Sequence, residues 1–524
     1  MRRLTGWTIA MVGAALPAAA LLAQTAQPAL TGDGFAARFS ILGQVQPRSA
    51  VSIDANRWSV GAEAIDRDYS TYNSWRSYLG PLGAKAARLQ SGWARTDLGA
   101  GRYDFAWLDP IIDDMLAQGV QPWVSLSYGN HRYVGGGAGR RDSPLPSGAG
   151  RKAWLAYVTA VATRYRGKVK EYEIWNEPEL VASVEAPEYG IFAHETAQAI
   201  KKADPAAGVI LGAFAGAVWQ GEGTKPARDR EFARVAVETF VKLSGKGAAN
   251  AVTYHAYHPN PDAVYASIPS FKAMIHAIDP GIEVRQGENG APSLNQQHYA
   301  LRNMWWTEER QAKWLLRRML GDAAYRVPTS IFTITEMHYP VSAETNLAFV
   351  GHRTDKPPAA DSTKHFKGLL ETRLYAPGSP EDDRTVVRTK MGYPAMQAVT
   401  AIFDSRLEPV GDPGNAAGTT SACTVTGGTG PITAHAFRRA DGAAVVAVWR
   451  SGDAPGDNAA HELVDVSCPT LAFGSGPLYV DLLTRAVYRT KGVVETSGAG
   501  SRISGLPVYD SPVLILSAPL VSAR

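Results

Sequence analysis

The sequence contains only two cysteines among its 524 residues, Cys423 and Cys468, and both lie in its carboxyl-terminal part. Neither the cysteines nor the histidines follow the spacing of zinc ligands, so no structural zinc site is predicted. The clustered His and Asp ligands that hold catalytic metals are also lacking, and we expect neither a metal nor an organic cofactor. In an exported protein the two cysteines are expected to pair; two buried free thiols are the alternative.

A strong charge imbalance is lacking as well. The formal net charge of +4 is small for a chain of this length, and no run is rich in Lys or Arg. A nucleic-acid partner is therefore not predicted. The Gly-rich stretch Gly135–Gly139 lacks the Lys-Ser/Thr pair of a phosphate-binding loop, which argues against a nucleotide site.

Long apolar runs are confined to the amino terminus. Two arginines precede an apolar run from Trp7 to Ala23, and small and polar residues follow it. This order is typical of a secretory signal peptide, here residues 1–26, with an uncleaved anchor as the alternative. No later stretch is long enough to span a bilayer, so we expect a periplasmic or secreted protein whose mature form has no membrane partner. Nothing in the sequence predicts an oligomeric state.

What the sequence does contain, from residue 57 to residue 405, is a repeated alternation of strand-like and helix-like segments. The predicted strands are Arg57–Ile65, Lys85–Trp93, Val120–Tyr128, Val169–Ile174, Gly208–Ala215, Ala251–Tyr257, Ile282–Arg285 and Thr329–Met337. The predicted helices are Tyr69–Leu79, Asp104–Gln118, Arg151–Arg166, Pro187–Ala203, Asp229–Leu243, Ala263–Ile278, Thr307–Tyr325 and Tyr393–Phe403. Eight such units predict an α/β fold, the (β/α)8 barrel. The polar segment Tyr339–Met391 is predicted to be an insertion over its active-site face.

The composition changes near Leu407, where Gly, Thr and Ser become more frequent. Short β-like runs separated by turn residues follow, and they predict a β-sandwich domain over residues 406–524. These runs are Ala422–Val425, Ile432–Phe437, Ala443–Trp449, Glu462–Val466, Leu478–Leu483 and Val508–Leu516. The segment 27–56 is predicted to join this β-domain.

The most informative stretch, Trp175-Asn176-Glu177-Pro178, lies at the end of the fourth predicted strand. Proline restricts the residue before it and donates no hydrogen bond, so the strand ends here. In a (β/α)8 barrel, chemistry takes place at the carboxyl ends of the strands. Trp175 would partly desolvate Glu177, which favours the protonated form that acid catalysis needs. A solvated glutamate before a turn is the simpler alternative.

A second carboxylate favours the catalytic interpretation of Glu177 over that of a solvated glutamate. Glu288 follows the seventh predicted strand within Gly287-Glu288-Asn289-Gly290, and 111 residues separate it from Glu177. This spacing leaves room for about three βα units. We therefore expect both glutamates at the same end of the barrel, with their carboxyl groups about 5–5.5 Å apart as in retaining glycosidases.

The two glutamate stretches resemble the acid/base and nucleophile motifs of clan A glycoside hydrolases, which are retaining enzymes built on (β/α)8 barrels. The trailing β-domain is similar to that of family 39. The resemblance implies that Glu177 is the acid/base and Glu288 the nucleophile. It also implies that Arg88 lies near the nucleophile, and that either His255 or Tyr257 contacts it; the sequence leaves that choice open.

Further candidates for sugar binding lie at or just after predicted strand ends, where aromatic faces and planar polar groups suit a carbohydrate. The principal ones are Asn176, Trp175, Asn130, Asn289, Trp306 and His338, with Trp93, Tyr128, His131, Trp305 and Tyr339 as further possibilities. Each is about as consistent with packing as with ligand contact. The leading hypothesis is an exported retaining glycoside hydrolase with a carbohydrate substrate. The alternative is a non-catalytic carbohydrate-binding or polysaccharide-assembly barrel, and a metal-dependent hydrolase is a distant third.

Overall fold

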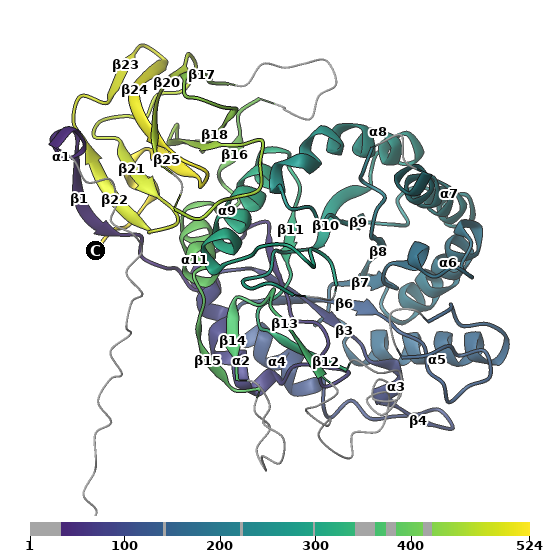
Figure 1. The fold of residues 1–524 in the computed structure, drawn as a ribbon. Helices are drawn as coiled ribbons and strands as arrows, with labels where there is room; N and C mark the ends of the chain where they lie inside the picture. Colours follow the sequence, from purple (N-terminus) through teal and green to yellow (C-terminus); the bar gives the residue numbers. More distant parts are fainter. Residues whose placement is uncertain are drawn as a thin grey trace, which may run out of the picture.

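The computed structural model describes a barrel ringed by helices and a separate stack of antiparallel sheets beside it (Figure 1). The described residues are 33–139, 143–220, 224–296, 299–340, 362–373, 384–411, 422–458 and 460–524. The predicted signal peptide, residues 1–26, lies outside them. Within these ranges no helix has the length and apolar character needed to cross a bilayer.

Eight parallel strands close into the barrel in the order in which they follow one another along the chain. They are β2 (Trp58–Gly61), β3 (Ala86–Gln90), β6 (Gln121–Leu126), β7 (Glu171–Ile174), β8 (Gly208–Phe214), β9 (Ala251–His255), β10 (Glu283–Asn289) and β11 (Thr329–Ile331). The ring closes where β11 pairs with β2. The predicted (β/α)8 barrel is confirmed.

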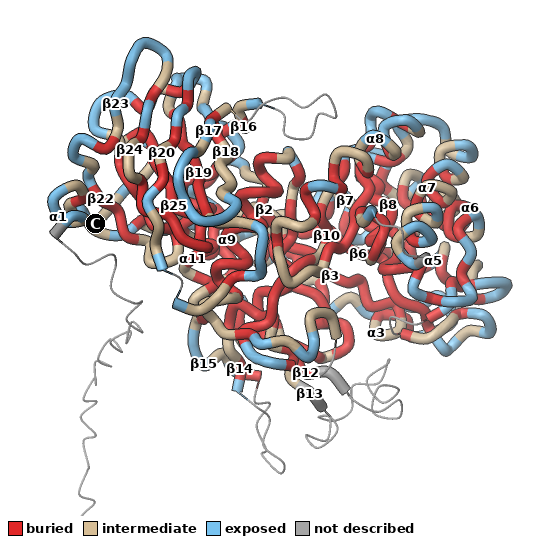
Figure 2. The backbone as a smooth tube through the Cα atoms, turned by 45° about the horizontal axis from the view of Figure 1, so that its top comes forward, coloured by how far each residue is buried: buried red, intermediate tan, exposed pale blue. Residues whose placement is uncertain are grey.

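Helices cover the outside of the barrel, and most have a buried inner face and an exposed outer face (Figure 2). They are α2 (Tyr72–Leu79), α4 (Asp109–Ala117), α5 (Gly148–Arg164), α6 (Ala186–Ala203), α7 (Thr224–Ser244), α8 (Ile268–Ile278), α9 (Glu308–Ala324) and α11 (Gly392–Ile402). The single helix expected over Ala263–Ile278 is instead a 3₁₀ segment, η4 (Pro261–Ala266), followed by α8. Both segments carry a proline in their first turn, where its missing donor costs nothing.

Short elements lie between these units or beside them. They are α1 (Asp33–Arg38), η1 (Ala50–Ser52), η2 (Gly80–Leu82), α3 (Trp93–Thr96), η3 (Pro178–Leu180), η6 (Ala518–Leu520) and a hairpin of β4 (Asp97–Gly99) and β5 (Arg102–Tyr103). The hairpin and α3 lie in the second βα connection.

The described parts of the insertion form two small antiparallel sheets at the end of the barrel where β11 leads out. One pairs β12 (Met337–Pro340) with β13 (Ser362–His365), and the other pairs β14 (Leu370–Thr372) with β15 (Val386–Thr389). The amides of Leu369 and Leu370 donate to the carbonyls of Thr333 and Ile334, at 2.9 and 3.0 Å. These bonds fix the insertion at the carboxyl-terminal end of the barrel strands.

The β-domain is a sandwich of two antiparallel sheets, as predicted. The larger sheet contains, in order, β1 (Phe39–Gln44), β22 (Ala486–Thr490), β21 (Leu478–Asp481), β25 (Val513–Leu516), β19 (Ala444–Arg450), β18 (Ile432–Arg438) and β16 (Glu408–Pro409). The smaller contains β17 (Thr424–Gly427), β20 (Glu462–Cys468), β24 (Gly500–Val508) and β23 (Val494–Ser497). The run expected over Val508–Leu516 is two strands, because a turn separates β24 from β25.

Two features tie the sandwich together and to the barrel. Cys423 and Cys468 form a disulfide within it, so the predicted pairing is confirmed. Strand β19 is buried on both faces: Val446 and Val448 pack into the core between the sheets, whereas Trp449 packs into the core shared with the barrel. The larger sheet is therefore the layer that joins the sandwich to the barrel.

Candidate active site

The backbone after β7 leaves the extended conformation at once. Trp175 and Glu177 have φ values of 71° and 50°, in the left-handed region that costs a residue with a side chain on the order of 1–3 kcal/mol. The amide of Glu177 donates to the carbonyl of Ala213 on β8 at 3.0 Å. Because the chain turns this way, Asn176 and Glu177 both reach the polar centre of the barrel mouth, although they are adjacent.

The strained turn is stabilised by an aromatic cluster behind it. Trp175 is fully buried and packs edge-on against Trp154 and Phe192, with ring centroids 5.6 and 5.5 Å away. The structure thus corrects the expectation that Trp175 contacts a sugar: it anchors the end of β7 from inside the fold.

A register shift presents Glu288 at the mouth. In the pairing of β10 with β9, Gln286 lies opposite Tyr254 and Glu288 lies opposite His255, so Gly287 is an extra residue. Such bulges re-aim side chains and are frequent beside active sites. The side chain of Glu288 remains 15% exposed, whereas Arg88, which pairs with it, is fully buried.

The two glutamates converge on one histidine. Nδ1 of His255 lies 3.0 Å from Oε1 of Glu177 and 3.9 Å from Oε2 of Glu288. One carboxylate oxygen of each glutamate and this nitrogen all lie within 4.8 Å of one another. The hydroxyl of Tyr257 donates to Oε1 of Glu288 at 2.8 Å. Of the two residues that the sequence left open, Tyr257 therefore hydrogen-bonds Glu288, and His255 hydrogen-bonds Glu177.

Burial and the charges of the two glutamates set the protonation of His255 and Tyr257. Burial alone would lower the pKa of His255, but the carboxylates of Glu288 and Glu177 outweigh it and raise that pKa above its ordinary value. Burial, together with the charge of Glu288, raises the pKa of Tyr257 well above the ordinary value. The phenol thus remains a hydrogen-bond donor to Glu288 throughout the neutral range.

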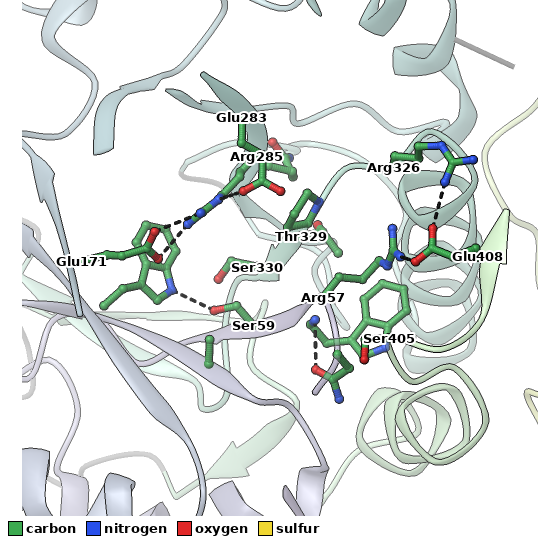
Figure 3. A pocket seen from close by; sticks show the side chains of 16 residues that line it. Arg57, Ser59, Glu171, Glu283, Arg285, Arg326, Thr329, Ser330, Ser405 and Glu408 are labelled. Atoms are coloured by element: carbon green, nitrogen blue, oxygen red, sulfur yellow. Dashed lines mark hydrogen bonds and ion pairs between the residues drawn. The ribbon is translucent and has the colours of Figure 1, made fainter. Parts of the chain in front are cut away.

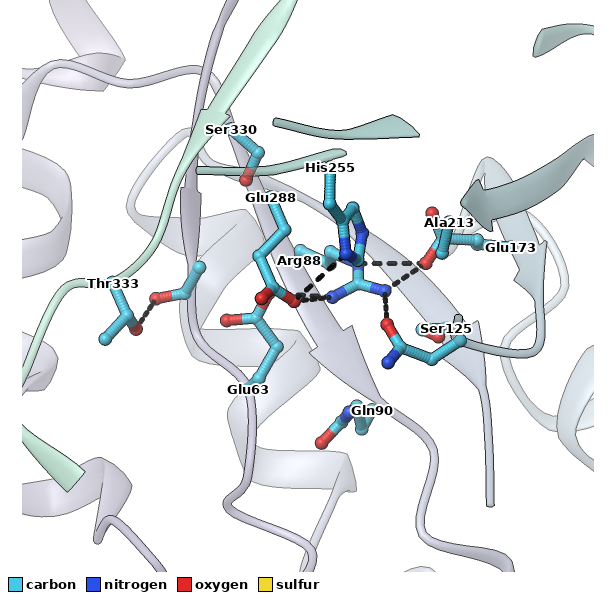
Figure 4. A network of polar contacts seen from close by, with 12 residues as sticks. Glu63, Arg88, Gln90, Ser125, Glu173, Ala213, His255, Glu288, Ser330 and Thr333 are labelled. Atoms are coloured by element: carbon cyan, nitrogen blue, oxygen red, sulfur yellow. Dashed lines mark hydrogen bonds and ion pairs between the residues drawn. The ribbon is translucent and has the colours of Figure 1, made fainter. Parts of the chain in front are cut away.

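Arg88 on β3 joins these groups into one network (Figure 4). Its guanidinium is fully buried and donates to Glu173 at 2.9 and 2.5 Å, to Asn176 at 2.8 Å, to Glu63 at 3.1 Å and to Glu288 at 3.2 Å. A planar guanidinium fixes its acceptors in direction as well as distance. One side chain therefore positions Asn176 and Glu288 relative to each other.

The sequence singled out neither Glu173 of this network nor Glu63, which lies just after β2. Its Oε1 accepts from the same Arg88 nitrogen as Glu288 does, and its Oε2 is buried without a hydrogen-bond partner. A Cβ on Gly61 would lie 2.2 Å from that Oε2, so only glycine leaves room for the carboxyl group. Burial raises the pKa of Glu63 to about 7, and the nearby Glu288 charge adds to the effect of burial.

The raised pKa predicts how Glu63→Gln changes stability with pH. Glu63 binds a proton more tightly in the folded protein than in the unfolded chain, where its pKa is near 4.5. The contribution of Glu63 to the free energy of unfolding therefore falls from about pH 4.5 to about pH 7 and then levels off. Glutamine does not titrate, so Glu63→Gln should gain stability relative to the wild type across that window. Urea unfolding at pH 4.5, 6 and 8 measures this, and a gap that does not widen with pH would contradict it.

Four other predicted site residues lie in packing positions. Asn289 is fully buried and donates to Thr329 Oγ1 at 2.9 Å, pinning β10 to β11. Trp306 is 3% exposed, and its indole N–H donates to the Leu301 carbonyl at 3.1 Å. For these two the structure corrects the expected sugar contact, because Asn289 is engaged by β11 and Trp306 packs in an apolar cluster with Ala291 and Trp314.

The other two, Asn130 and His338, are also buried. The side-chain amide of Asn130 donates to Asp97 on β4 at 3.4 Å, and its oxygen accepts from the Arg132 amide at 3.0 Å, which joins its loop to the β4–β5 hairpin. Nε2 of His338 lies 3.2 Å from Oγ1 of Thr372 in the insertion. These contacts support the loops that carry the two residues.

Among the secondary candidates, Tyr128 accepts a hydrogen bond from Asn176 at 2.9 Å and belongs to the site. Trp93 is fully buried, whereas His131 and Trp305 are exposed. The side chain of Tyr339 lies outside the described part of the structure.

Glu177, His255 and Glu288 also form the one group in the described ranges whose donor atoms are close enough to hold a metal ion. The fully buried Arg88 lies 3.2 Å from Glu288 and supplies a fixed positive charge there. A cation at the same place would be repelled by this charge, so these three side chains suit acid–base chemistry better than metal binding.

A hollow of about 440 Å³ lies at the opposite, amino-terminal end of the barrel, and the charged residues in its lining are paired with one another (Figure 3). Arg285 binds Glu171 at 2.8 and 2.9 Å, and Glu408 binds both Arg326 at 2.8 Å and Arg57 at 3.2 Å. Residues at this end of a (β/α)8 barrel contribute to stability rather than to chemistry. We therefore place the functional site at the Glu177–Glu288 end.

Comparison with known proteins shows the fold. The sequence matches no family model and no curated protein. A family 39 glycoside hydrolase from the gut symbiont Bacteroides cellulosilyticus WH2 superposes with a TM-score of 0.57 at 14% identity, over 88% of this chain and 80% of that one. The family 39 enzyme from Xanthomonas axonopodis pv. citri gives 0.53 at 16% identity, over 90% and 97%. A monomeric beta-xylosidase from Caulobacter crescentus CB15 gives 0.51 at 17% identity, over 92% and 98%. The shared architecture is the barrel together with its β-sandwich.

Proposed function

We propose that this protein is an exported retaining glycoside hydrolase that cleaves O-glycosidic bonds in an oligo- or polysaccharide. The observation that carries the proposal is the convergence of Glu177 and Glu288 from the fourth and seventh barrel strands, with carboxylate oxygens within 4.8 Å. Retaining enzymes hold their two carboxyl groups about 5–5.5 Å apart, whereas inverting enzymes need about 6.5–9.5 Å to admit a water molecule. The likeness to family 39 structures supports the fold on which this chemistry would run.

In this proposal Glu288 attacks the anomeric carbon, and Glu177 protonates the leaving oxygen. Arg88 and Tyr257 each donate a hydrogen bond to the carboxylate of Glu288 and aim it at the mouth of the barrel. Glu177 then removes a proton from water, and the hydroxide displaces Glu288 from the glycosyl-enzyme. Each displacement inverts the anomeric carbon, so the product retains the configuration of the substrate.

His255 and Asn176 position the reacting groups. The Nδ1 of His255 hydrogen-bonds Glu177 at 3.0 Å and holds that carboxyl group over the anomeric position. Asn176 is held by hydrogen bonds to Arg88 and Tyr128, and it is placed to bind a sugar hydroxyl beside Glu288. Export is proposed from the amino-terminal sequence, and the disulfide, which persists in oxidising compartments, supports it.

Stereochemistry tests the proposal. The wild-type protein would be screened on a panel of 4-nitrophenyl glycosides headed by the β-xyloside, because one structural neighbour is a beta-xylosidase. Proton NMR of the first minutes of hydrolysis should show the anomer of the substrate forming before mutarotation equilibrates it. An initial product of opposite configuration would refute double displacement. Sugar binding without turnover on any substrate would favour the alternative of a carbohydrate-binding barrel.

A further inference from the structure

A second hollow, of about 450 Å³, lies where the barrel meets the β-sandwich. Its walls come from the loop after β10, the start of α9, the insertion and the sandwich loop carrying Asp457 and Asn458. The first three of these segments belong to the carboxyl-terminal end of the barrel, where Glu177 and Glu288 also lie. The volume falls within the range of ligand sites, about 300–1,000 Å³.

One segment of the chain, which contains Phe366 and Lys367, lies between this hollow and the surroundings of Glu288. Phe366 lines the hollow, and the next residue, Lys367, is buried on the other side of the same segment. Nζ of Lys367 lies 5.0 Å from the ring centroid of Tyr257, whose hydroxyl donates to Glu288. Leu294, a further lining residue, follows Glu288 by only six positions. The hollow is therefore a neighbour of the catalytic pair.

Ion pairs hold the walls in fixed positions. Arg388 of the insertion binds both Glu308 of α9, at 3.1 Å, and Glu371, at 2.7 Å. Arg310 of α9 binds Asp457 of the sandwich at 3.0 Å. Planar groups locked in this way need little ordering when a ligand binds, which lowers the entropic cost of binding.

The lining suits an uncharged, hydroxylated ligand with apolar faces. The half-buried ring of Phe366 and the 53% exposed side chain of Leu294 offer surfaces on which a sugar ring can pack. Five carboxylates against three basic side chains leave the lining with excess negative charge, which disfavours an acidic ligand.

We propose that this hollow is a distal subsite for a neutral oligosaccharide. A chain cleaved between Glu177 and Glu288 would extend over the Phe366–Lys367 segment to the border with the sandwich, which makes the β-domain part of the substrate-binding surface. This link to cleavage rests on the proposed function, whereas binding in the hollow does not. The consequence is a preference for chains over single terminal sugars, because binding energy from remote sugar units becomes available.

Equilibrium binding to the full chain carrying Glu288→Ala tests the subsite without hydrolysis. The probes are xylo-, cello- and manno-oligosaccharides of two to six units, with oligogalacturonides as acidic counterparts, measured by isothermal titration calorimetry. At least one neutral series should bind at least about 10-fold more tightly at six units than at two, as expected if remote units add about 1.4 kcal/mol. Adding Leu294→Ala or Asn458→Ala should abolish that gain, whereas Leu463→Ala, the same change at a similarly exposed leucine on strand β20, should leave it intact.

Three outcomes would overturn the subsite. The first two are affinity that does not rise with the length of any neutral chain, and tighter binding of the oligogalacturonides. The third is length-dependent binding that survives both Leu294→Ala and Asn458→Ala, because the gain would then arise elsewhere. Hydrolysis by the wild type separates the two proposals. If chains bind at the hollow but no glycoside is cleaved, the proposed function fails and the subsite stands. If glycosides are cleaved with no dependence on chain length, the subsite fails and the proposed function stands.

Discussion

Replacing Glu288 with alanine is expected to lower kcat for every glycoside by on the order of 10⁵-fold, because the first chemical step loses its nucleophile. The loss should be the same for good and poor leaving groups, since neither can be displaced without an attacking carboxylate. Initial rates on 4-nitrophenyl glycosides measure it, with the enzyme concentrated enough to detect residual turnover.

Folding controls accompany this variant, since Glu288 is one of the acceptors of Arg88. Glu173 and Glu63 still neutralise that guanidinium after the substitution, so the thermal unfolding midpoint should stay close to that of the wild type. Glu495→Ala, on the exposed strand β23, is the matched control and should retain full activity. Residual activity above about 1% on any substrate would rule out Glu288 as the nucleophile. Azide should restore turnover with inverted configuration, because the small anion attacks directly from the vacated side.

The barrel and the two glutamates could be predicted because each is encoded locally. Strand–helix alternation specifies the barrel unit by unit, and Glu177 and Glu288 each stand in a short motif at a strand end. Glu63 could not be found this way. Nothing near it in the sequence distinguishes it, and its raised pKa arises from burial and from the charge of Glu288 on β10, which together outweigh the opposing effect of Arg88 on β3. Such groups become visible only when the strands are placed side by side.

The two asparagines that accompany the glutamates show why adjacency in sequence misleads. In an extended strand successive side chains point to opposite faces. Asn289 obeys this rule: Glu288 faces the mouth, and Asn289 is buried against β11. Asn176 lies beyond the end of β7, where the left-handed backbone of Trp175 and Glu177 breaks the alternation. Strand periodicity could have excluded Asn289 in advance, whereas the position of Asn176 depends on tertiary packing.

Replacing Glu177 with alanine is expected to separate substrates by their leaving groups. A 2,4-dinitrophenolate departs without protonation, so the first step on such a glycoside should fall by no more than about 10-fold. An unactivated sugar linkage needs the proton that Glu177 supplies, and its hydrolysis should fall by about 10³- to 10⁴-fold. The second step also needs Glu177, as general base. A burst of dinitrophenolate followed by a slow steady state should therefore appear in stopped-flow traces.

Azide distinguishes the role of Glu177 from that of Glu288. In Glu177→Ala the nucleophile is intact, so the glycosyl-enzyme forms on the activated substrate and azide, entering the space left by the carboxyl group, attacks it from the opposite face. Two inversions give a glycosyl azide of retained configuration, and the steady-state rate should rise with azide concentration. The Glu288→Ala product, formed by one inversion, should have the opposite configuration. If NMR of the two azides showed the configurations exchanged, the roles assigned to Glu177 and Glu288 would have to be exchanged with them.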